Sequence, residues 1–116
     1  MVPPKLLQVR FYQSDKGNEP VREWLKSLSE DDRRIIGMDL KTVEYGWPIG
    51  MPLCRKVRGD IWEVRSKLTG NNNIARVLFA ATDKHLVLLN GFVKKTQKTP
   101  DDEIDLAQQR LRSLKS

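Results

Sequence analysis

Four strand-like runs separated by short turns constrain the fold of this 116-residue chain more than any other feature. The runs occupy residues 53–58, 61–68, 74–81 and 85–92, and apolar side chains recur along each of them. Only two to five residues separate one run from the next. Connections this short join antiparallel neighbours, because a parallel crossover needs a dozen or more residues. The sequence therefore predicts a four-stranded antiparallel meander.

One further strand and two helices are expected before this meander. Apolar and polar side chains alternate at residues 7–12, which is typical of a half-buried strand. Pro20 fits the first turn of a helix whose apolar side chains recur at helical spacing up to Leu28. Ser29 is a suitable N-cap for a second helix, which is expected to end near Gly46.

A third helix is expected after the meander, with Thr99 as its N-cap and Pro100 in its first turn. The resulting order is β-α-α-β-β-β-β-α, which predicts a compact α+β domain over residues 1–116 with the first strand at an edge of the sheet. The single cysteine, Cys54, excludes a disulfide framework, and no apolar run is long enough to span a bilayer. We expect a cytoplasmic protein with no membrane association, no metal and no other cofactor.

The positive charge of the chain is concentrated in the predicted sheet. The net charge is +6, yet residues 1–50 are neutral, residues 51–98 carry +7 and residues 99–116 carry −1. The ten basic residues of the middle stretch are Arg55, Lys56, Arg58, Arg65, Lys67, Arg76, Lys84, Lys94, Lys95 and Lys98. Such a concentration favours a polyanionic partner, usually nucleic acid, over a basic surface without a ligand.

Two arginines stand out because they interrupt apolar runs. Arg65 and Arg76 lie near the middle of consecutive predicted strands, so antiparallel pairing would bring them together on one face of the sheet. Like charges side by side are unfavourable without an anion, and a phosphate between two guanidinium groups removes this difficulty. Glu63 is predicted to share the face of Arg65. The alternative is that Glu63 pairs with one of the arginines and that both are solvated.

The segment that leaves the last predicted strand combines an aromatic ring with three lysines. Phe92 precedes Lys94, Lys95 and Lys98. Lysines bind phosphates as point charges, and an aromatic ring can stack on a base. The alternative is a solvated connector with Phe92 in the core.

Four stretches of the sequence, together with the order of the expected elements, resemble a known family. They are residues 20–25 (PVREWL), 61–65 (IWEVR), 76–79 (RVLF) and 90–100 (NGFVKKTQKTP). The chain resembles the RelE/ParE superfamily of toxins from bacterial toxin–antitoxin modules, and most closely its HigB-type, phage-derived branch. The resemblance covers about residues 7–114, and the last stretch is its most specific part.

The resemblance implies a RelE-like fold and the activity of an mRNA interferase. Such a toxin is a metal-independent endoribonuclease that cuts mRNA in the ribosomal A site. Its partners are mRNA, the ribosome and a cognate antitoxin, here expected to be of the helix-turn-helix type. The RNA supplies its own nucleophile, because the 2′-OH attacks the neighbouring phosphate.

The resemblance gives the residues around the scissile phosphate, and the chemistry of the side chains suggests the other roles. Arg65, Arg76 and Lys94 take the positions around the scissile phosphate, with Lys94 or Lys95 as the proton donor. Glu63 is the nearest candidate for a base, and the alternative for it is a structural ion pair. The residues expected to bind RNA around this centre are Arg55, Lys56, Arg58, Lys67, Phe92, Lys95 and Lys98.

Two other functions remain open. The same superfamily contains toxins that poison DNA gyrase, and these need no phosphate-binding cluster. A nonenzymatic RNA- or DNA-binding module would bind in a salt-sensitive manner without forming a product.

Overall fold

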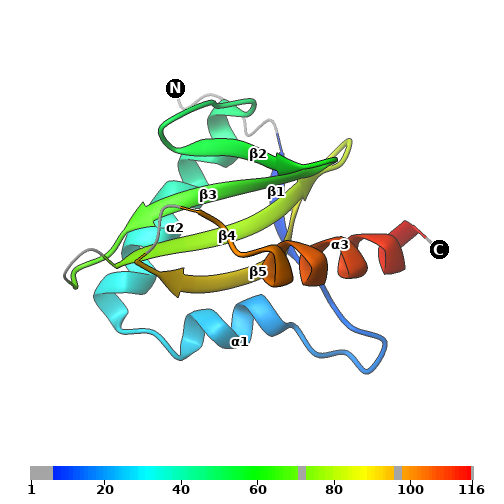
Figure 1. Ribbon diagram of the computed structural model, residues 1–116, viewed down its shortest axis with the longest axis horizontal. Coiled ribbons are helices and arrows are strands. Elements are labelled where there is room, and N and C mark those ends of the chain that lie inside the picture. Colours follow the sequence, from blue (N-terminus) through cyan, green and yellow to red (C-terminus); the bar gives the residue numbers. More distant parts are fainter. Residues whose placement is uncertain (1–6, 71–72, 96–97, 116) are drawn as a thin grey trace.

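Five strands form one sheet with helices on both of its faces in the computed structural model (Figure 1). The structure describes residues 7–70, 73–95 and 98–115. The elements are β1 (Gln8–Phe11), α1 (Pro20–Lys26), α2 (Glu30–Gly46), β2 (Cys54–Arg58), β3 (Ile61–Lys67), β4 (Ile74–Ala81), β5 (His85–Lys94) and α3 (Asp101–Lys115). This order confirms the predicted α+β fold. Residues 1–6, part of the predicted turn at 69–73, and Thr96 and Gln97 of the exit segment lie outside the described residues.

The sheet has the strand order β1-β5-β4-β3-β2. The pairs β2–β3, β3–β4 and β4–β5 are antiparallel, which confirms the meander, and β1 joins the edge beside β5 as a parallel strand. The last strand was predicted to end at Phe92, but the ladder continues because Val93 and Lys94 pair with Ala75 and Ile74. The exit segment therefore begins at Lys95.

A bulge in β5 changes the direction of its side chains. The register of β4 and β5 shifts between Leu78 and Phe79, so that Leu89 lies opposite no residue of β4. An extra residue inverts the alternation of every side chain that follows it. Phe92 consequently lies opposite Arg76 and shares its face of the sheet.

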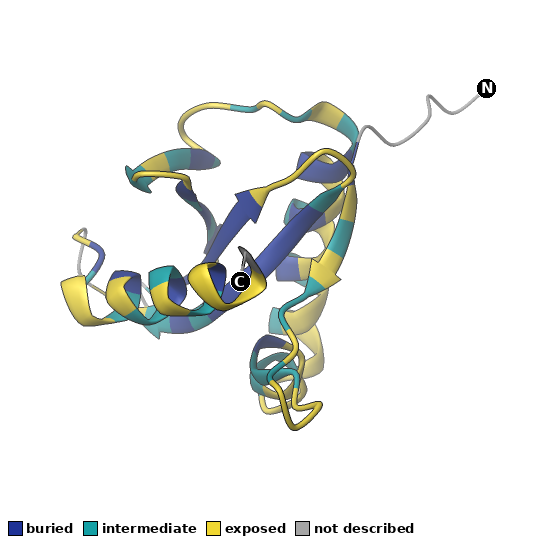
Figure 2. Ribbon diagram, turned by 90° about the vertical axis from the view of Figure 1, so that its right-hand side faces the viewer, coloured by how far each residue is buried: buried dark blue, intermediate teal, exposed yellow. Residues whose placement is uncertain are grey.

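Two apolar clusters hold the helices against the sheet, one on each face (Figure 2). The first joins α1 and α2 to the sheet and includes Val21, Ile36, Leu40, Val43, Val64, Val77, Phe79 and Leu88. The second joins α3 to the opposite face and includes Ile61, Leu78, Leu89, Phe92, Ile104, Ala107 and Leu111. The sheet is thus buried on both sides, which explains why β4 and β5 are apolar almost throughout.

The predicted helix ends are confirmed for α2 but not for α3. Ser29 caps α2, since its hydroxyl accepts a hydrogen bond from the Asp32 N–H at 3.2 Å. The prediction of Thr99 as the cap of α3 is wrong. The helix begins at Asp101, and the hydroxyl of Thr99 is instead bound to Glu63. None of the helices in the described ranges has the length and apolarity needed to cross a membrane.

Gly91 lets α1 approach the sheet. A methyl carbon built on Gly91 would lie 2.5 Å from Cζ3 of Trp24 and still nearer to Cε3, so the indole ring occupies the space of a side chain. The resemblance to the toxin family included Gly91, and the structure supplies a packing reason for the glycine at that position.

We expect the change Gly91→Ala to lower the free energy of unfolding by about 1–3 kcal/mol, because the Trp24 ring must shift to admit the methyl group. Gly37→Ala is the matched control. Gly37 is exposed in α2 with nothing near its Cβ position, so alanine there should raise stability by about 0.5–1 kcal/mol. Urea denaturation measures both changes, and equal effects would contradict the packing role of Gly91.

Cys54 is a core residue at the start of β2. Its side chain is fully buried, and burial raises the pKa of the thiol to about 11, with the nearby Asp39 carboxylate adding to the shift. A thiol with a raised pKa is neutral and unreactive at physiological pH.

Iodoacetamide at pH 8 should therefore leave Cys54 unmodified in the native protein, because the reagent attacks the thiolate. The same reagent in guanidinium chloride should modify it fully. Mass spectrometry of the two samples checks this, and rapid labelling of the native protein would show that β2 opens readily.

Candidate nucleic-acid interface

Arg65 and Arg76 lie directly opposite one another on β3 and β4, as predicted. Both belong to the face of the sheet that α3 partly covers. Their exposure differs, however. The side chain of Arg65 is 15% exposed, whereas Arg76 is fully buried and donates from Nη1 to the carbonyl of Lys98 at 3.4 Å. Arg76 is therefore not open to a phosphate held between the two guanidinium groups in this structure, because it is buried and bound to the backbone of Lys98.

A buried carboxylate joins the basic side chains of this face. Glu63 is fully buried, and its Oε1 accepts a hydrogen bond from Arg55 Nε at 2.8 Å and lies 4.0 Å from Arg65 Nε. Its Oε2 accepts from the Thr99 hydroxyl. Both oxygens are thus occupied and shielded from solvent. This geometry favours the structural ion pair over the role of a base.

Three guanidinium groups share this single carboxylate. Burial lowers the pKa of Arg76, Glu63 raises it, and the positive charges of Arg65 and Arg55 lower it again. Arginine nevertheless stays protonated at all physiological pH values. The cluster of Arg55, Glu63, Arg65 and Arg76 therefore carries more positive than negative charge, which an approaching anion would offset.

Two exposed lysines flank the Arg65–Arg76 row. Lys67 and Lys94 both lie opposite Ile74, one on each neighbouring strand. The bulge in β5 is what places Lys94 on this face, since an unbroken alternation would turn it toward α1 and α2. The structure thus brings Arg65, Arg76 and Lys94 to one region of the sheet.

Two of the predicted RNA-binding residues have structural roles instead. Phe92 is only 7% exposed and packs in the core beneath α3, so its ring is not available for stacking. Arg58 is bound to Asp105, and its Nη2 lies 3.6 Å from Asp101. The core position of Phe92 was the alternative left open by the sequence, whereas the contact of Arg58 was not predicted because it joins β2 to a helix more than forty residues away in the chain.

The remaining predicted residues lie on β2, at the edge of the sheet, and just after β5; Lys56 is opposite Trp62, which packs toward α1 and α2. Lys56 and Lys95 are exposed, and Arg55 is 36% exposed. A small pocket of about 220 Å³ lies between β2 and the start of α3. Its lining includes Arg55, Lys56 and Lys98, together with Thr99 and Asp101.

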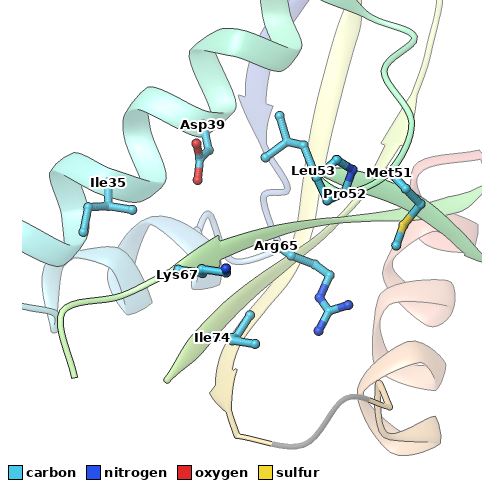
Figure 3. A pocket seen from close by; sticks show the side chains of 8 residues that line it. All are labelled: Ile35, Asp39, Met51, Pro52, Leu53, Arg65, Lys67 and Ile74. Carbon is cyan, nitrogen blue, oxygen red and sulfur yellow. The ribbon is translucent and has the colours of Figure 1, made fainter. Parts of the chain in front are cut away.

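A larger pocket lies beside Arg65, at the end of β3 that extends beyond β2 (Figure 3). Its volume is about 570 Å³, and Asp39 of α2 is part of its wall. Sequence reasoning did not single out Asp39, because a lone acidic residue in an amphipathic helix gives no local signal. Within the described ranges no three His, Cys, Asp or Glu side chains cluster as metal ligands.

The structural role of Glu63 is tested by its removal. We expect Glu63→Ala to lower the free energy of unfolding by about 2–4 kcal/mol, because Arg55 and Arg65 then lose their buried partner. Glu30→Ala is the control, since Glu30 is exposed and lies 3.8 Å from Arg34. That change should alter stability by less than about 0.5 kcal/mol. Similar melting curves for both variants would show that the Glu63 contacts contribute little.

Comparison with known proteins identifies the family. The family model of phage-derived, Gp49-like proteins matches residues 23–112. No curated protein matches the chain. The matched region extends from α1 into the last turns of α3, so it contains the whole basic cluster and both flanking lysines. Since the match covers well over half of the sequence, the chain belongs to the family of phage-derived, Gp49-like proteins.

Proposed function

We propose that this protein is the toxin of a toxin–antitoxin module and cleaves mRNA on the ribosome without a metal ion. The observation that carries the proposal is the pairing of Arg65 with Arg76 on one sheet face, with Lys94 on the same face. The HigB-like sequence features and the phage-derived family support the same class of function.

The chemistry needs only fixed positive charge and a proton donor. In the proposed reaction the 2′-oxygen of the RNA attacks the adjacent phosphorus, and the bond to the 5′-oxygen breaks. The products are a 2′,3′-cyclic phosphate and a 5′-hydroxyl. Arg65 binds the phosphate and stabilises the charge that develops on its oxygens. Lys94 gives a proton to the leaving 5′-oxygen, and the proton of the 2′-OH passes to solvent.

Arg76 and Glu63 act as positioning residues in this proposal. Arg76 is buried and donates a hydrogen bond to the carbonyl of Lys98, so it adds positive charge beneath the site and holds the backbone at Lys98. Glu63 balances part of that charge and fixes Arg55 and Thr99. The exposed lysines around the site (Lys56, Lys67 and Lys95) then contact ribosomal RNA or mRNA backbone. An acidic segment of a helix-turn-helix antitoxin is the proposed cover for the same surface.

Removal of either Arg65 or Lys94 should abolish toxicity. We expect Arg65→Ala and Lys94→Ala each to lower mRNA cleavage about 100-fold, because each removes a group that acts on the charge of the transition state. Growth after induction and transcriptome-wide mapping of RNA 5′ ends measure this. Arg33→Ala in α2 and Lys84→Ala at the other end of β5 remove equal charge from exposed positions outside the site. Both controls should remain toxic.

The mapped RNA ends also separate the competing functions. Cuts that follow the reading frame support the ribosome-dependent nuclease. Growth arrest with DNA breaks and intact mRNA would instead indicate a gyrase poison. Salt-sensitive RNA binding with neither outcome would indicate a nonenzymatic module. Wild-type activity in both Arg65→Ala and Lys94→Ala would contradict the assigned site.

A further inference from the structure

We propose that the pocket beside Arg65 binds an RNA base next to the scissile phosphate, and that Asp39 selects bases with an exocyclic amino group. This inference rests on the proposed function, because it names the substrate feature that the same site recognises. Nothing in the sequence pattern pointed to it, since the pocket is assembled from α2, the connection before β2, and the ends of β3 and β4.

The size and lining of the pocket suit a nucleobase. Its volume of about 570 Å³ lies within the range of about 300–1,000 Å³ that is typical of sites for small molecules. The apolar part of the lining consists of Ile35, Met51, Pro52, Leu53 and Ile74. Aliphatic and proline side chains offer surface on which the faces of a base can pack, and this contact does not by itself depend on base identity.

The polar groups lie at different ends of the pocket. Figure 3 shows Asp39 on α2 at one side and Arg65 at the other, with Lys67 on β3 between them. A nucleotide has the same order of groups, with a phosphate at one end, an apolar ring system and amino or carbonyl groups at the far edge. Phosphate contact at Arg65 therefore places the base toward α2.

Asp39 supplies the selective contact. Its Oδ2 accepts a hydrogen bond from the Ser66 hydroxyl at 2.6 Å, which fixes the carboxylate. The described part of the chain contributes no second hydrogen bond and no ion pair to Asp39. A carboxylate can only accept, so a ligand that satisfies the other oxygen must donate. Adenine, cytosine and guanine carry an exocyclic amino group that donates, whereas uracil has carbonyl oxygens on either side of its one edge donor, the ring N3–H, and these would repel a carboxylate.

The carboxylate also discriminates between RNA and an acidic peptide. Both ligands would be attracted by Arg65 and Lys67. A peptide rich in Asp or Glu, however, would bring its carboxylates close to Asp39, and like charges in a partly buried pocket repel one another. The combination of cations at one side and an acceptor at the other therefore favours a nucleotide.

The first test uses the mapped cleavage sites. We expect the wild-type protein to prefer amino-bearing bases over uridine about tenfold at one position beside the cut, the size expected for a hydrogen bond to a charged group. Asp39→Asn should reduce this preference to less than about threefold. Asp31→Asn is the matched control, because it neutralises an exposed carboxylate of the same helix that does not line the pocket, and it should keep the wild-type preference.

The second test measures binding without cleavage. The probes are fluorescent 2′-O-methyl RNA tetranucleotides, which lack the attacking hydroxyl and differ only by adenosine or uridine at one position. Fluorescence anisotropy should show about tenfold tighter binding of the adenosine probe by the wild-type protein and by Asp31→Asn. Asp39→Asn should lose this difference. Thermal melting of all three proteins shows whether the fold is retained.

The two tests separate failure of the site from failure of the proposed function. Cleavage with the same base preference in wild type and Asp39→Asn would overturn the base site and leave the nuclease intact. Discrimination between the probes without any RNA cleavage in cells would overturn the nuclease and support the base site. Equal affinity of the wild-type protein for both probes would also overturn the base site.

Discussion

The buried carboxylate of Glu63 is the interaction on which the site depends. It accepts hydrogen bonds from Arg55 on β2 and from Thr99 just before α3, and it lies beside Arg65 on its own strand. A buried carboxylate without partners is strongly destabilising, so these three contacts are expected to form together. One acidic side chain therefore joins the edge of the sheet, its centre and the start of the last helix, while it limits the repulsion among the arginines.

The bulge in β5 is the second constraint, and α3 secures it. The carbonyl of Leu89, the extra residue, accepts a hydrogen bond from Arg110 of α3 at 2.6 Å. This contact satisfies a backbone group that the ladder with β4 does not use. The bulge turns Lys94 to the face of Arg76. Since α3 binds the bulged residue, this helix helps to keep Lys94 on that face.

The basic residues of the sheet divide into two groups by what they contact. Arg55, Arg58 and Arg76 hold β2, the exit segment and α3 in place through Glu63, Asp105 and the Lys98 carbonyl. Lys56, Lys67, Lys94 and Lys95 are exposed around them. A net charge read from the sequence combines both groups, although the charge at the surface comes mainly from the lysines, with a part from Arg65, whose side chain is 15% exposed. The positive surface is consequently smaller than the charge suggests, and it is centred on the end of β3.

By itself, the sequence determined the meander, the edge position of the first strand and the meeting of Arg65 with Arg76, because turn length and period-two alternation act locally. The family resemblance implied that Lys94 joins these arginines, but strand alternation does not predict it. The tertiary structure supplies the physical reason, since one bulged residue inverts the alternation that a sequence pattern assumes. It also decided that Phe92 is core and that Thr99 binds Glu63, 36 residues away. The pocket of Asp39 likewise has no local signal, because its walls meet only when α2 packs beside β3.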